Sequence, residues 1–289
     1  MQKNTTMILI CDCGSTKAEW VLKDRNEVVK RFVTDGFNPN FTDNDMMNGI
    51  VKQSLTNIAD YQDVSNVFFY GSGCGSGANQ VRVKLIFNKF YPKSNTEVYP
   101  DTLAACHALF GNNPGIACIL GTGSNACVYD GAVITESVAS LGFMIGDEGS
   151  GCHIGKRIVH DYFLGLMPDD LRTKFDAKYH LDREAFLKKV YQGEQPSRYL
   201  AEFAKFASEN IDNQYVVKAV SSCFEGFINN LNVGTWRAAS VQNVSFVGSV
   251  AYIFKDILVK CLDKHNIKCQ KILKNPMDGL IEYYQEAIA

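Results

Sequence analysis

Apolar and polar positions along the first 34 residues follow the pattern of a β-meander. Met7 to Cys11 form a continuous apolar run that breaks at a glycine turn over residues 12–16. Apolar and polar residues then alternate from Ala18 to Lys23, and a third apolar stretch follows at 28–33. Continuous and alternating apolar runs separated by turn residues are typical of strands. We therefore predict three consecutive antiparallel strands.

The next segment alternates between helical and strand patterns. Apolar residues at helical spacing predict helices over 43–61, with Thr42 and Asp43 as candidate N-caps, and over 79–90. Short apolar runs predict strands at 67–70 and 97–99, and the first of them leads into the glycine-rich loop 71–77. A further helix opens at Asp101 and stops at Gly111.

From residue 115 the opening pattern returns. Strands are predicted at 116–120, 125–129 and 132–135, with a glycine turn over 121–124. After residue 151 we expect helices over 151–166, 183–191, 197–209 and 214–232, a strand at 244–247, a helix to Leu262 and a terminal helix over 278–289. This internal duplication predicts two similar lobes, each with one strand–turn–strand phosphate grip.

Composition narrows the class of partner. The chain has 289 residues, 46% of them hydrophobic, which is enough to bury the cores of two lobes. Its 29 basic and 31 acidic residues form no long basic block, so we expect a small-molecule partner and neither nucleic acid nor membrane. The short apolar run near the start is not a signal peptide, and we expect a cytoplasmic protein.

The ten cysteines are scattered through apolar segments. We expect buried, reduced thiols, because a disulfide framework is typical of short secreted chains. No paired C-x-x-C spacing is present, which argues against a structural zinc site.

Two glycine turns carry candidate phosphate-binding groups. Asp12 offers a carboxylate to a hydrated Mg²⁺ ion, and Gly14, Ser15, Thr16 and Lys17 offer backbone amides and hydroxyls to phosphate oxygens. The second turn, Gly121, Thr122, Gly123, Ser124 and Asn125, repeats this chemistry. No helix follows the first turn directly, so it is neither a P-loop nor a dinucleotide motif, and each turn alone could be an ordinary hairpin.

Asp101 is the candidate general base. It follows an apolar strand and opens a helix, where a carboxylate between two phosphate loops could take a proton from an acceptor hydroxyl. The alternative is a plain helix N-cap.

Further candidates lie in other loops. The glycine-bounded loop 142–150 contains Asp147 and Glu148, which could bind sugar hydroxyls or cap the following helix. Gly248 and Ser249 follow a buried strand and lack large side chains, so a purine could lie against them, although small residues also ease packing. Asn38 could bind a hydroxyl or make a turn before Pro39. His107 is expected to be a packed core residue.

Taken together, the segments DCGSTKAEW, GSGCGSG, PDTLAACHALFG, ILGTGSNACVYDG, SLGFMIGDEGSGCHIGKRIV and FVGSVA resemble the N-acetylglucosamine kinase branch of the actin, sugar kinase and heat-shock ATPase superfamily. This branch also includes the BadF, BadG, BcrA and BcrD type ATPases. The similarity covers nearly the whole chain in the right order.

The resemblance implies an α/β fold of two ribonuclease-H-like lobes, each a mixed five-stranded sheet flanked by helices, with a nucleotide cleft between them. The lobes would span 1–109 and 110–289, and the terminal helix at about 276–289 would pack back on the first. ATP and Mg²⁺ are the implied cofactors. Asp12 would bind the metal, and the two glycine turns would bind the phosphates. Gly248 and Ser249 would contact the adenosine.

For the sugar, the resemblance points to Asn38, Asp101, Asp147 and the stretch Ser140, Leu141 and Gly142. The animal enzymes have Gly-Trp-Gly where this chain has Ser140 to Gly142, so a stacking aromatic is absent here. The sequence thus predicts an ATP-dependent kinase for N-acetylglucosamine or a related amino sugar, with a homodimer as one option. The alternatives are an ATPase that drives electron transfer in a partner enzyme, and a sugar-sensing regulator.

Overall fold

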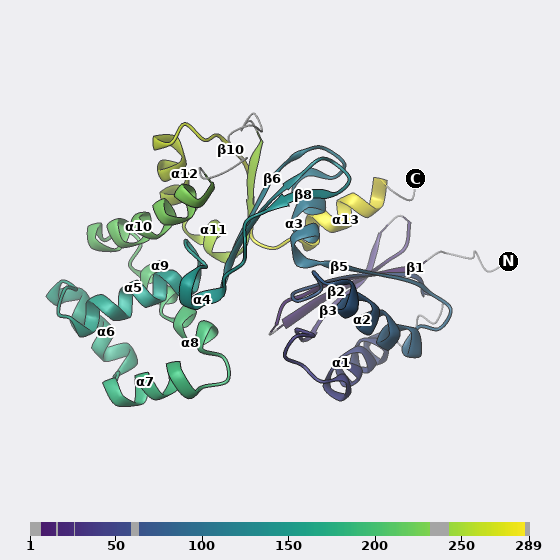
Figure 1. The fold of residues 1–289 in the computed structure, drawn as a ribbon, viewed down its shortest axis with the longest axis horizontal. Coiled ribbons are helices and arrows are strands. Elements are labelled where there is room, and N and C mark those ends of the chain that lie inside the picture. Colours follow the sequence, from purple (N-terminus) through teal and green to yellow (C-terminus); the bar gives the residue numbers. More distant parts are fainter. Residues whose placement is uncertain (1–6, 16, 26, 59–63, 232–242, 287–289) are drawn as a thin grey trace. The chain divides into compact units, whose positions relative to one another are not determined.

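The structure is a computed structural model that describes residues 7–15, 17–25, 27–58, 64–231 and 243–286. Its contacts divide the chain into two compact units. Unit 1 comprises residues 1–112 and 276–289, and unit 2 comprises residues 113–275. Each unit contains one five-stranded sheet with helices packed against it (Figure 1).

The sheet of unit 1 begins with the predicted meander. Strands β1 (Met7–Cys13), β2 (Lys17–Lys23) and β3 (Val28–Asp35) pair antiparallel, while β4 (Val64–Gly71) and β5 (Asn95–Pro100) add parallel to the other edge of β1. The strand order is β3-β2-β1-β4-β5. β1 lies at the centre and is fully apolar up to Asp12, as expected for a strand covered on both faces.

Helices α1 (Asn44–Asn57) and α2 (Gly77–Phe90) cover one face of this sheet (Figure 1). Asp43 caps α1, as predicted, and accepts a hydrogen bond from the amide of Met46. The buried residues of both helices pack with Trp20, Phe69 and other inward-facing strand residues in one hydrophobic cluster.

Helices α3 (Asp101–Phe110) and α13 (Met277–Glu286) lie on the opposite face (Figure 1). The Tyr70 hydroxyl of β4 lies 2.7 Å from Nδ1 of His107 on α3 and 2.7 Å from the Tyr284 hydroxyl on α13. Tyr283 stacks on the His107 ring at 4.1 Å between centroids. Burial lowers the pKa of His107 to about 4, so this residue is a neutral, packed core histidine, as predicted.

Unit 2 repeats the sheet topology of unit 1. Strands β6 (Gly115–Leu120), β7 (Ser124–Tyr129) and β8 (Ile134–Ser137) form the meander, and β9 (Val244–Val247) and β10 (Cys269–Leu273) add parallel strands. The strand order is β10-β9-β6-β7-β8. Read from the other edge, β8-β7-β6-β9-β10 has the same arrangement as β3-β2-β1-β4-β5 in unit 1. The predicted internal duplication and fold class, with two mixed five-stranded sheets, are confirmed.

The core of unit 2 is formed by its helices together with the sheet. Helices α5, α10 and α12 contribute buried residues such as Ile158, Phe224 and Leu258, which pack with Cys118 and Phe246 from the sheet. The helices of this unit are α4 (Gly142–Ile145), α5 (Gly151–Phe163), α6 (Asp169–Tyr179), α7 (Arg183–Gln192), α8 (Pro196–Glu202), α9 (Ala204–Glu209), α10 (Gln214–Leu231), α11 (Ser249–Ile253) and α12 (Lys255–Lys264).

Several predicted elements differ from the observed ones. The predicted helix 197–209 is two helices that meet at the buried Phe203, and the helix expected from 249 to 262 is divided at the buried Phe254. Strand β8 starts at Ile134 rather than at residue 132, because Asp130 accepts hydrogen bonds from the amides of Ala132 and Val133 and extends the turn. Helices α4 and α6 and strand β10 have no counterpart among the predicted elements.

All ten cysteines are free, and nine of them are buried, which confirms that these thiols lie in the core as expected. Within the described ranges no helix is both long and apolar enough to cross a bilayer.

The contact between α3 and α13 depends on a glycine. A Cβ atom at Gly279 would lie 2.4 Å from the Ala108 carbonyl oxygen and 2.8 Å from the Ala108 Cβ. Gly279→Ala should therefore lower the free energy of unfolding by about 2 kcal/mol through overpacking, measured by urea denaturation. Gly49→Ala, at an exposed position of α1 where a Cβ meets nothing within 4 Å, should raise it by roughly 0.5–1 kcal/mol. Equal effects of the two changes would contradict the proposed tight contact.

Candidate functional site

Three candidate segments of unit 1 leave the sheet at the same edge. In the parallel register Cys13 of β1 pairs with Gly71 of β4, and Gly71 pairs with Pro100 of β5. The chain following each of these residues therefore emerges at the carboxyl ends of neighbouring parallel strands, where ligands bind in open α/β sheets. This edge carries the first glycine turn, the loop Gly71–Gly77 and Asp101.

The first glycine turn is a tight connection between β1 and β2. The amide of Gly14 donates to the carbonyl oxygen of Lys17 over 3.0 Å. Gly36, at the end of β3, packs directly on this turn, since a Cβ there would lie 2.0 Å from the Gly14 carbonyl oxygen. Ser15 and Lys17 are exposed, while Thr16 lies outside the described residues.

Asp12 lies at the end of β1 beneath this turn. Burial, followed by repulsion from Asp101 and Glu19, raises the pKa of its carboxyl group to about 7. Within the described ranges no group of three or more Cys, His, Asp or Glu side chains is placed to hold a metal by itself. A buried carboxylate that is repelled by a second carboxylate nevertheless fits a cation such as Mg²⁺, which takes few protein ligands and keeps several waters.

Asp101 is the first residue of α3, and its carboxylate is held from the neighbouring loop. The hydroxyl of Ser72 donates to Oδ2 of Asp101 over 2.8 Å. The alternative that Asp101 is the N-cap of α3 is wrong, because the N-cap position belongs to Pro100 and no side chain caps the helix there. Sequence reasoning singled out the loop Gly71–Gly77 but did not name Ser72 as a site residue.

Asn38 lies in a turn, which was the alternative interpretation of this residue. Its Oδ1 accepts a hydrogen bond from the amide of Asn40, and its carbonyl oxygen accepts from the amides of Phe41 and Thr42. The side chain packs against Gly73, where a Cβ would lie 2.1 Å from the Asn38 Oδ1. The turn fixes the orientation of the Asn38 side chain, because Oδ1 already accepts the Asn40 amide. The Nδ2 group is a donor suited to a sugar hydroxyl.

In unit 2 the second glycine turn is fixed from one side by the start of α5. The carbonyl oxygens of Gly121 and Thr122 accept hydrogen bonds from the amides of Gly151 and Cys152 over 2.8 and 3.0 Å. Gly248 lies against the same turn with φ 130°, and a Cβ there would lie 2.2 Å from the Leu120 carbonyl oxygen and 3.2 Å from the Gly121 amide nitrogen. The predicted phosphate turn and the predicted adenosine residue are thus adjacent, and Ser249 next to Gly248 opens α11.

Asp147 joins the second turn to the loop before α5. Its Oδ1 accepts a hydrogen bond from the Ser124 amide over 3.2 Å, and its carboxylate lies beside Gly123. The pKa of Asp147 is raised, mainly by burial. The alternative N-cap role is wrong for Asp147 and Glu148, because Ser150 caps α5 by accepting from the amide of His153.

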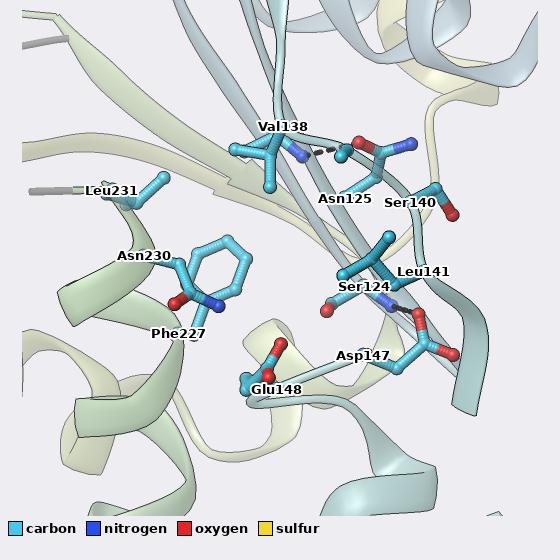
Figure 2. A pocket seen from close by; sticks show the side chains of 12 residues that line it. Ser124, Asn125, Val138, Ser140, Leu141, Asp147, Glu148, Phe227, Asn230 and Leu231 are labelled. Atoms are coloured by element: carbon cyan, nitrogen blue, oxygen red, sulfur yellow. Dashed lines mark hydrogen bonds between the residues drawn. The ribbon is translucent and has the colours of Figure 1, made fainter. Parts of the chain in front are cut away.

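A pocket in unit 2 collects several predicted residues (Figure 2). It encloses about 330 Å³, including solvent space at its mouth. Ser124, Asn125, Ser140, Leu141 and Asp147 line it, whereas Gly142 begins α4 and does not.

The opposite wall of this pocket was not predicted as part of a site. Phe227, Asn230 and Leu231 come from α10, and Glu148 extends into the pocket from the loop before α5 (Figure 2). The sequence predicted the α10 helix and noted Glu148. No signal in the helix distinguished Asn230 from a solvated polar residue, because the pocket that it lines also includes loop residues far away in the sequence.

The raised pKa of Asp12 predicts a pH-dependent stability in metal-free protein. Between about pH 4 and pH 7 the unfolded chain has lost the Asp12 proton while the folded chain keeps it, so wild-type stability falls as pH rises through this window. Asp12→Asn should therefore be more stable than wild type by about 4 kcal/mol at pH 8 and nearly equal at pH 4, in urea denaturation with a chelator present. Asp35→Asn, at an exposed position of β3, is the control and should change little at either pH. A destabilised Asp12→Asn protein at pH 8 would contradict the prediction.

Known proteins were compared with the chain by sequence and by structure. Neither the models of known protein families nor the curated protein sequences gave a match. Among solved structures, a proposed N-acetylglucosamine kinase from Porphyromonas gingivalis superposes with a TM-score of 0.91 and 34% identity, covering 98% of this chain and 100% of that one. A proposed N-acetylglucosamine kinase from Chromobacterium violaceum matches at TM-score 0.71 and 14% identity, with 97% and 99% covered.

A ROK family glucokinase from Streptomyces griseus, solved with glucose and AMPPNP, matches at TM-score 0.57 and 14% identity, covering 96% of this chain and 97% of that one. The two matches at 14% identity support the fold alone. The first match extends over nearly all of both chains at 34% identity. The chain therefore belongs to the N-acetylglucosamine kinase-like family of the actin-like ATPase superfamily.

Proposed function

We propose that this protein is an ATP-dependent kinase that phosphorylates a hydroxyl of N-acetylglucosamine or a related amino sugar. The observation that carries the proposal is the 34% identity, over 98% of the chain, to the Porphyromonas gingivalis protein described as an N-acetylglucosamine kinase. Sugar and ATP are the two proposed classes of ligand, and the Streptomyces griseus glucokinase, which shares the fold, was solved with glucose and AMPPNP.

In unit 1, Asp101 acts as the general base. Its carboxylate is fixed at the start of a helix and oriented by Ser72, which meets the requirement that a base be placed before its proton is transferred. Such a base contributes about 10²- to 10⁴-fold to the rate. Asn38 donates its amide Nδ2 group to the acceptor sugar from the turn beside Gly73.

Asp12 is the residue that would hold Mg²⁺, directly or through water. When bound, the ion would neutralise negative charge on the phosphates. Asp12 must lose its proton to take this role, and its pKa near 7 keeps both protonation states accessible around neutral pH. We propose that Gly14, Ser15, Thr16 and Lys17, which follow Asp12 closely in the chain, bind phosphate oxygens.

In unit 2, the turn from Gly121 to Asn125 binds the phosphates through its backbone amides and small hydroxyls, and Gly248 and Ser249 accommodate the adenosine. Ser140, Leu141, Gly142 and Asp147 remain the proposed sugar residues. The pocket adds Glu148 and Asn230 to this set as hydrogen-bonding groups and Phe227 as an apolar surface.

The electron-transfer ATPase alternative is not favoured. Such activators share an iron–sulfur cluster between subunits, which requires thiolates at the protein surface. Here nine of the ten cysteines are buried and Cys269 is half-buried, and burial raises the pKa of those with shifted values. The chain thus offers no exposed thiolate for a shared cluster.

The role of Asp101 is tested by Asp101→Asn. This change removes the basic carboxylate and should lower sugar-dependent ADP release by about 10²- to 10⁴-fold while ATP binding is retained, measured by a coupled assay and by calorimetry. Asp170→Asn, in the first turn of α6, is the matched control for a change of charge near a helix start and should turn over like wild type. Wild-type turnover in Asp101→Asn would remove Asp101 from the base role.

The acceptor class is tested by a screen of sugars. A site with the amide side chain of Asn230 beside an apolar wall should favour an N-acetyl group, so kcat/KM for N-acetylglucosamine should exceed that for glucose by about 10²-fold or more. Asn230→Ala should reduce kcat/KM for N-acetylglucosamine more than for glucose. A preference for glucose in the wild-type protein would overturn the amino-sugar assignment while leaving sugar kinase activity in place.

A further inference from the structure

The loop Gly71–Gly77 carries four glycines and two serines. It connects β4 to α2, and Ser76 at its end caps α2 by accepting from the amide of Asn79 over 3.3 Å. At its start the amide of Ser72 donates to the carbonyl oxygen of Cys13 over 3.0 Å. The loop is therefore anchored at both ends, next to the strand end that bears Asp12.

Ser72 fixes one oxygen of the proposed base. Its hydroxyl donates to Oδ2 of Asp101 over 2.8 Å, a charge-assisted hydrogen bond that restricts rotation of the carboxylate. Within the part of the chain that the structure describes, no donor is directed at the other oxygen, Oδ1. The hydrogen bond thus assigns the two oxygens different tasks, with Oδ2 held and Oδ1 left to accept the proton of the acceptor hydroxyl.

Gly73, the next residue, fixes the proposed sugar-binding amide. Its backbone has φ 80°, and a Cβ there would lie 2.1 Å from Oδ1 and 2.8 Å from Cγ of Asn38. Asn79 donates both to the Gly73 carbonyl oxygen, over 2.8 Å, and to Oδ1 of Asn40, over 2.7 Å. The turn that carries Asn38 is thereby fastened to the loop at the point where Gly73 leaves room for the side chain.

We propose that Ser72 and Gly73 are positioning residues for phosphoryl transfer: Ser72 orients Asp101, and Gly73 seats Asn38, so that one dipeptide sets the base relative to the acceptor-binding amide. This inference rests on the proposed kinase function. Correct placement of a reacting group is worth large factors in rate, and a shift of about 1 Å can cost about 10²-fold. The purely structural interpretation treats the glycines as a tight strand-to-helix turn.

The loop contains matched controls that separate these interpretations. Ser76 is a second serine, and among the described residues its side chain is bonded only to the Asn79 amide of the helix cap. Gly75 is a glycine where a Cβ meets nothing within 4 Å. Ser76→Ala should lower the thermal unfolding midpoint, because α2 loses its N-cap. It should leave kcat unchanged, and Gly75→Ala should leave kinetics unchanged.

The experiment measures kcat and both KM values for these variants with ATP, Mg²⁺ and N-acetylglucosamine, alongside thermal unfolding. Ser72→Ala should lower kcat by about 10- to 100-fold with KM for ATP unchanged, and Ser72→Thr, which keeps the hydroxyl, should recover most of the loss. Gly73→Ala should raise KM for the sugar by about 10-fold or more through displacement of Asn38, with KM for ATP unchanged.

Wild-type kcat in Ser72→Ala, or equal kinetics for Gly73→Ala and Gly75→Ala, would overturn the inference while leaving the kinase function standing. A wild-type protein that releases no ADP with any sugar in the screen would instead overturn the proposed function, and the inference with it. If Gly73→Ala does not fold, the kcat values of the Ser72 variants decide the inference. Ser72→Thr tests the effect of the hydroxyl, and Ser76→Ala tests the effect of any serine change in the loop.

Discussion

The repulsion between Asp12 and Asp101 is the constraint on which the site of unit 1 depends. Both carboxylates lie at the carboxyl ends of parallel strands, one on β1 and one directly after β5, with β4 between them. Burial of the Asp12 carboxyl group, and after it repulsion from Asp101, raises the pKa of Asp12 to about 7. A cation would relieve the same repulsion, so the arrangement is costly for the isolated chain and suited to a ligand that brings positive charge.

The two units show how one topology supports two kinds of chemistry. The strand order is the same in both sheets, so each has a glycine turn between its first two strands and loops at the ends of its parallel strands. In unit 1 these ends carry carboxylates, Asp12 and Asp101. In unit 2, Gly121 follows β6, the counterpart of β1, and Gly248 follows β9, the counterpart of β4. The missing side chain of Gly248 lets the backbone of Leu120 approach closely. Carboxylates suit a metal ion and a proton, whereas exposed backbone suits phosphates and a purine.

Much of the fold was predictable because its signals are local. The meander from Met7 to Asp35 follows from the period of apolar residues, and the duplication follows from the same pattern after residue 115. Strand β10 was missed because its five residues are all half-buried or exposed and resemble a loop. Helices α8 and α9 were merged because the break at Phe203 comes from packing of that ring in the core, which no local pattern reports.

The site residues also divide into those with a local sequence signal and those that depend on tertiary contacts. Glycine turns and a carboxylate after a strand are visible in sequence, so Asp12, Asp101, Gly121 and Gly248 could be named in advance. Ser72 could not, because its role lies in a hydrogen bond to a residue 29 positions away. Asn230 likewise reaches the pocket only through the packing of α10 beside the second glycine turn.

Helix α3 is held at both ends, and this bears on how Asp101 performs as a base. At the start of α3, Ser72 hydrogen-bonds to the Asp101 carboxylate. Near the end of α3, His107 is hydrogen-bonded to Tyr70 and stacked on Tyr283. Gly279 brings α13 into direct backbone contact with Ala108, so α3 cannot slide without disturbing the terminal helix. A catalytic group is placed accurately only when its supporting element is rigid. The orientation of residue 101 therefore depends on residues near position 284, and the carboxyl-terminal helix is part of what makes unit 1 a fixed platform for proton transfer.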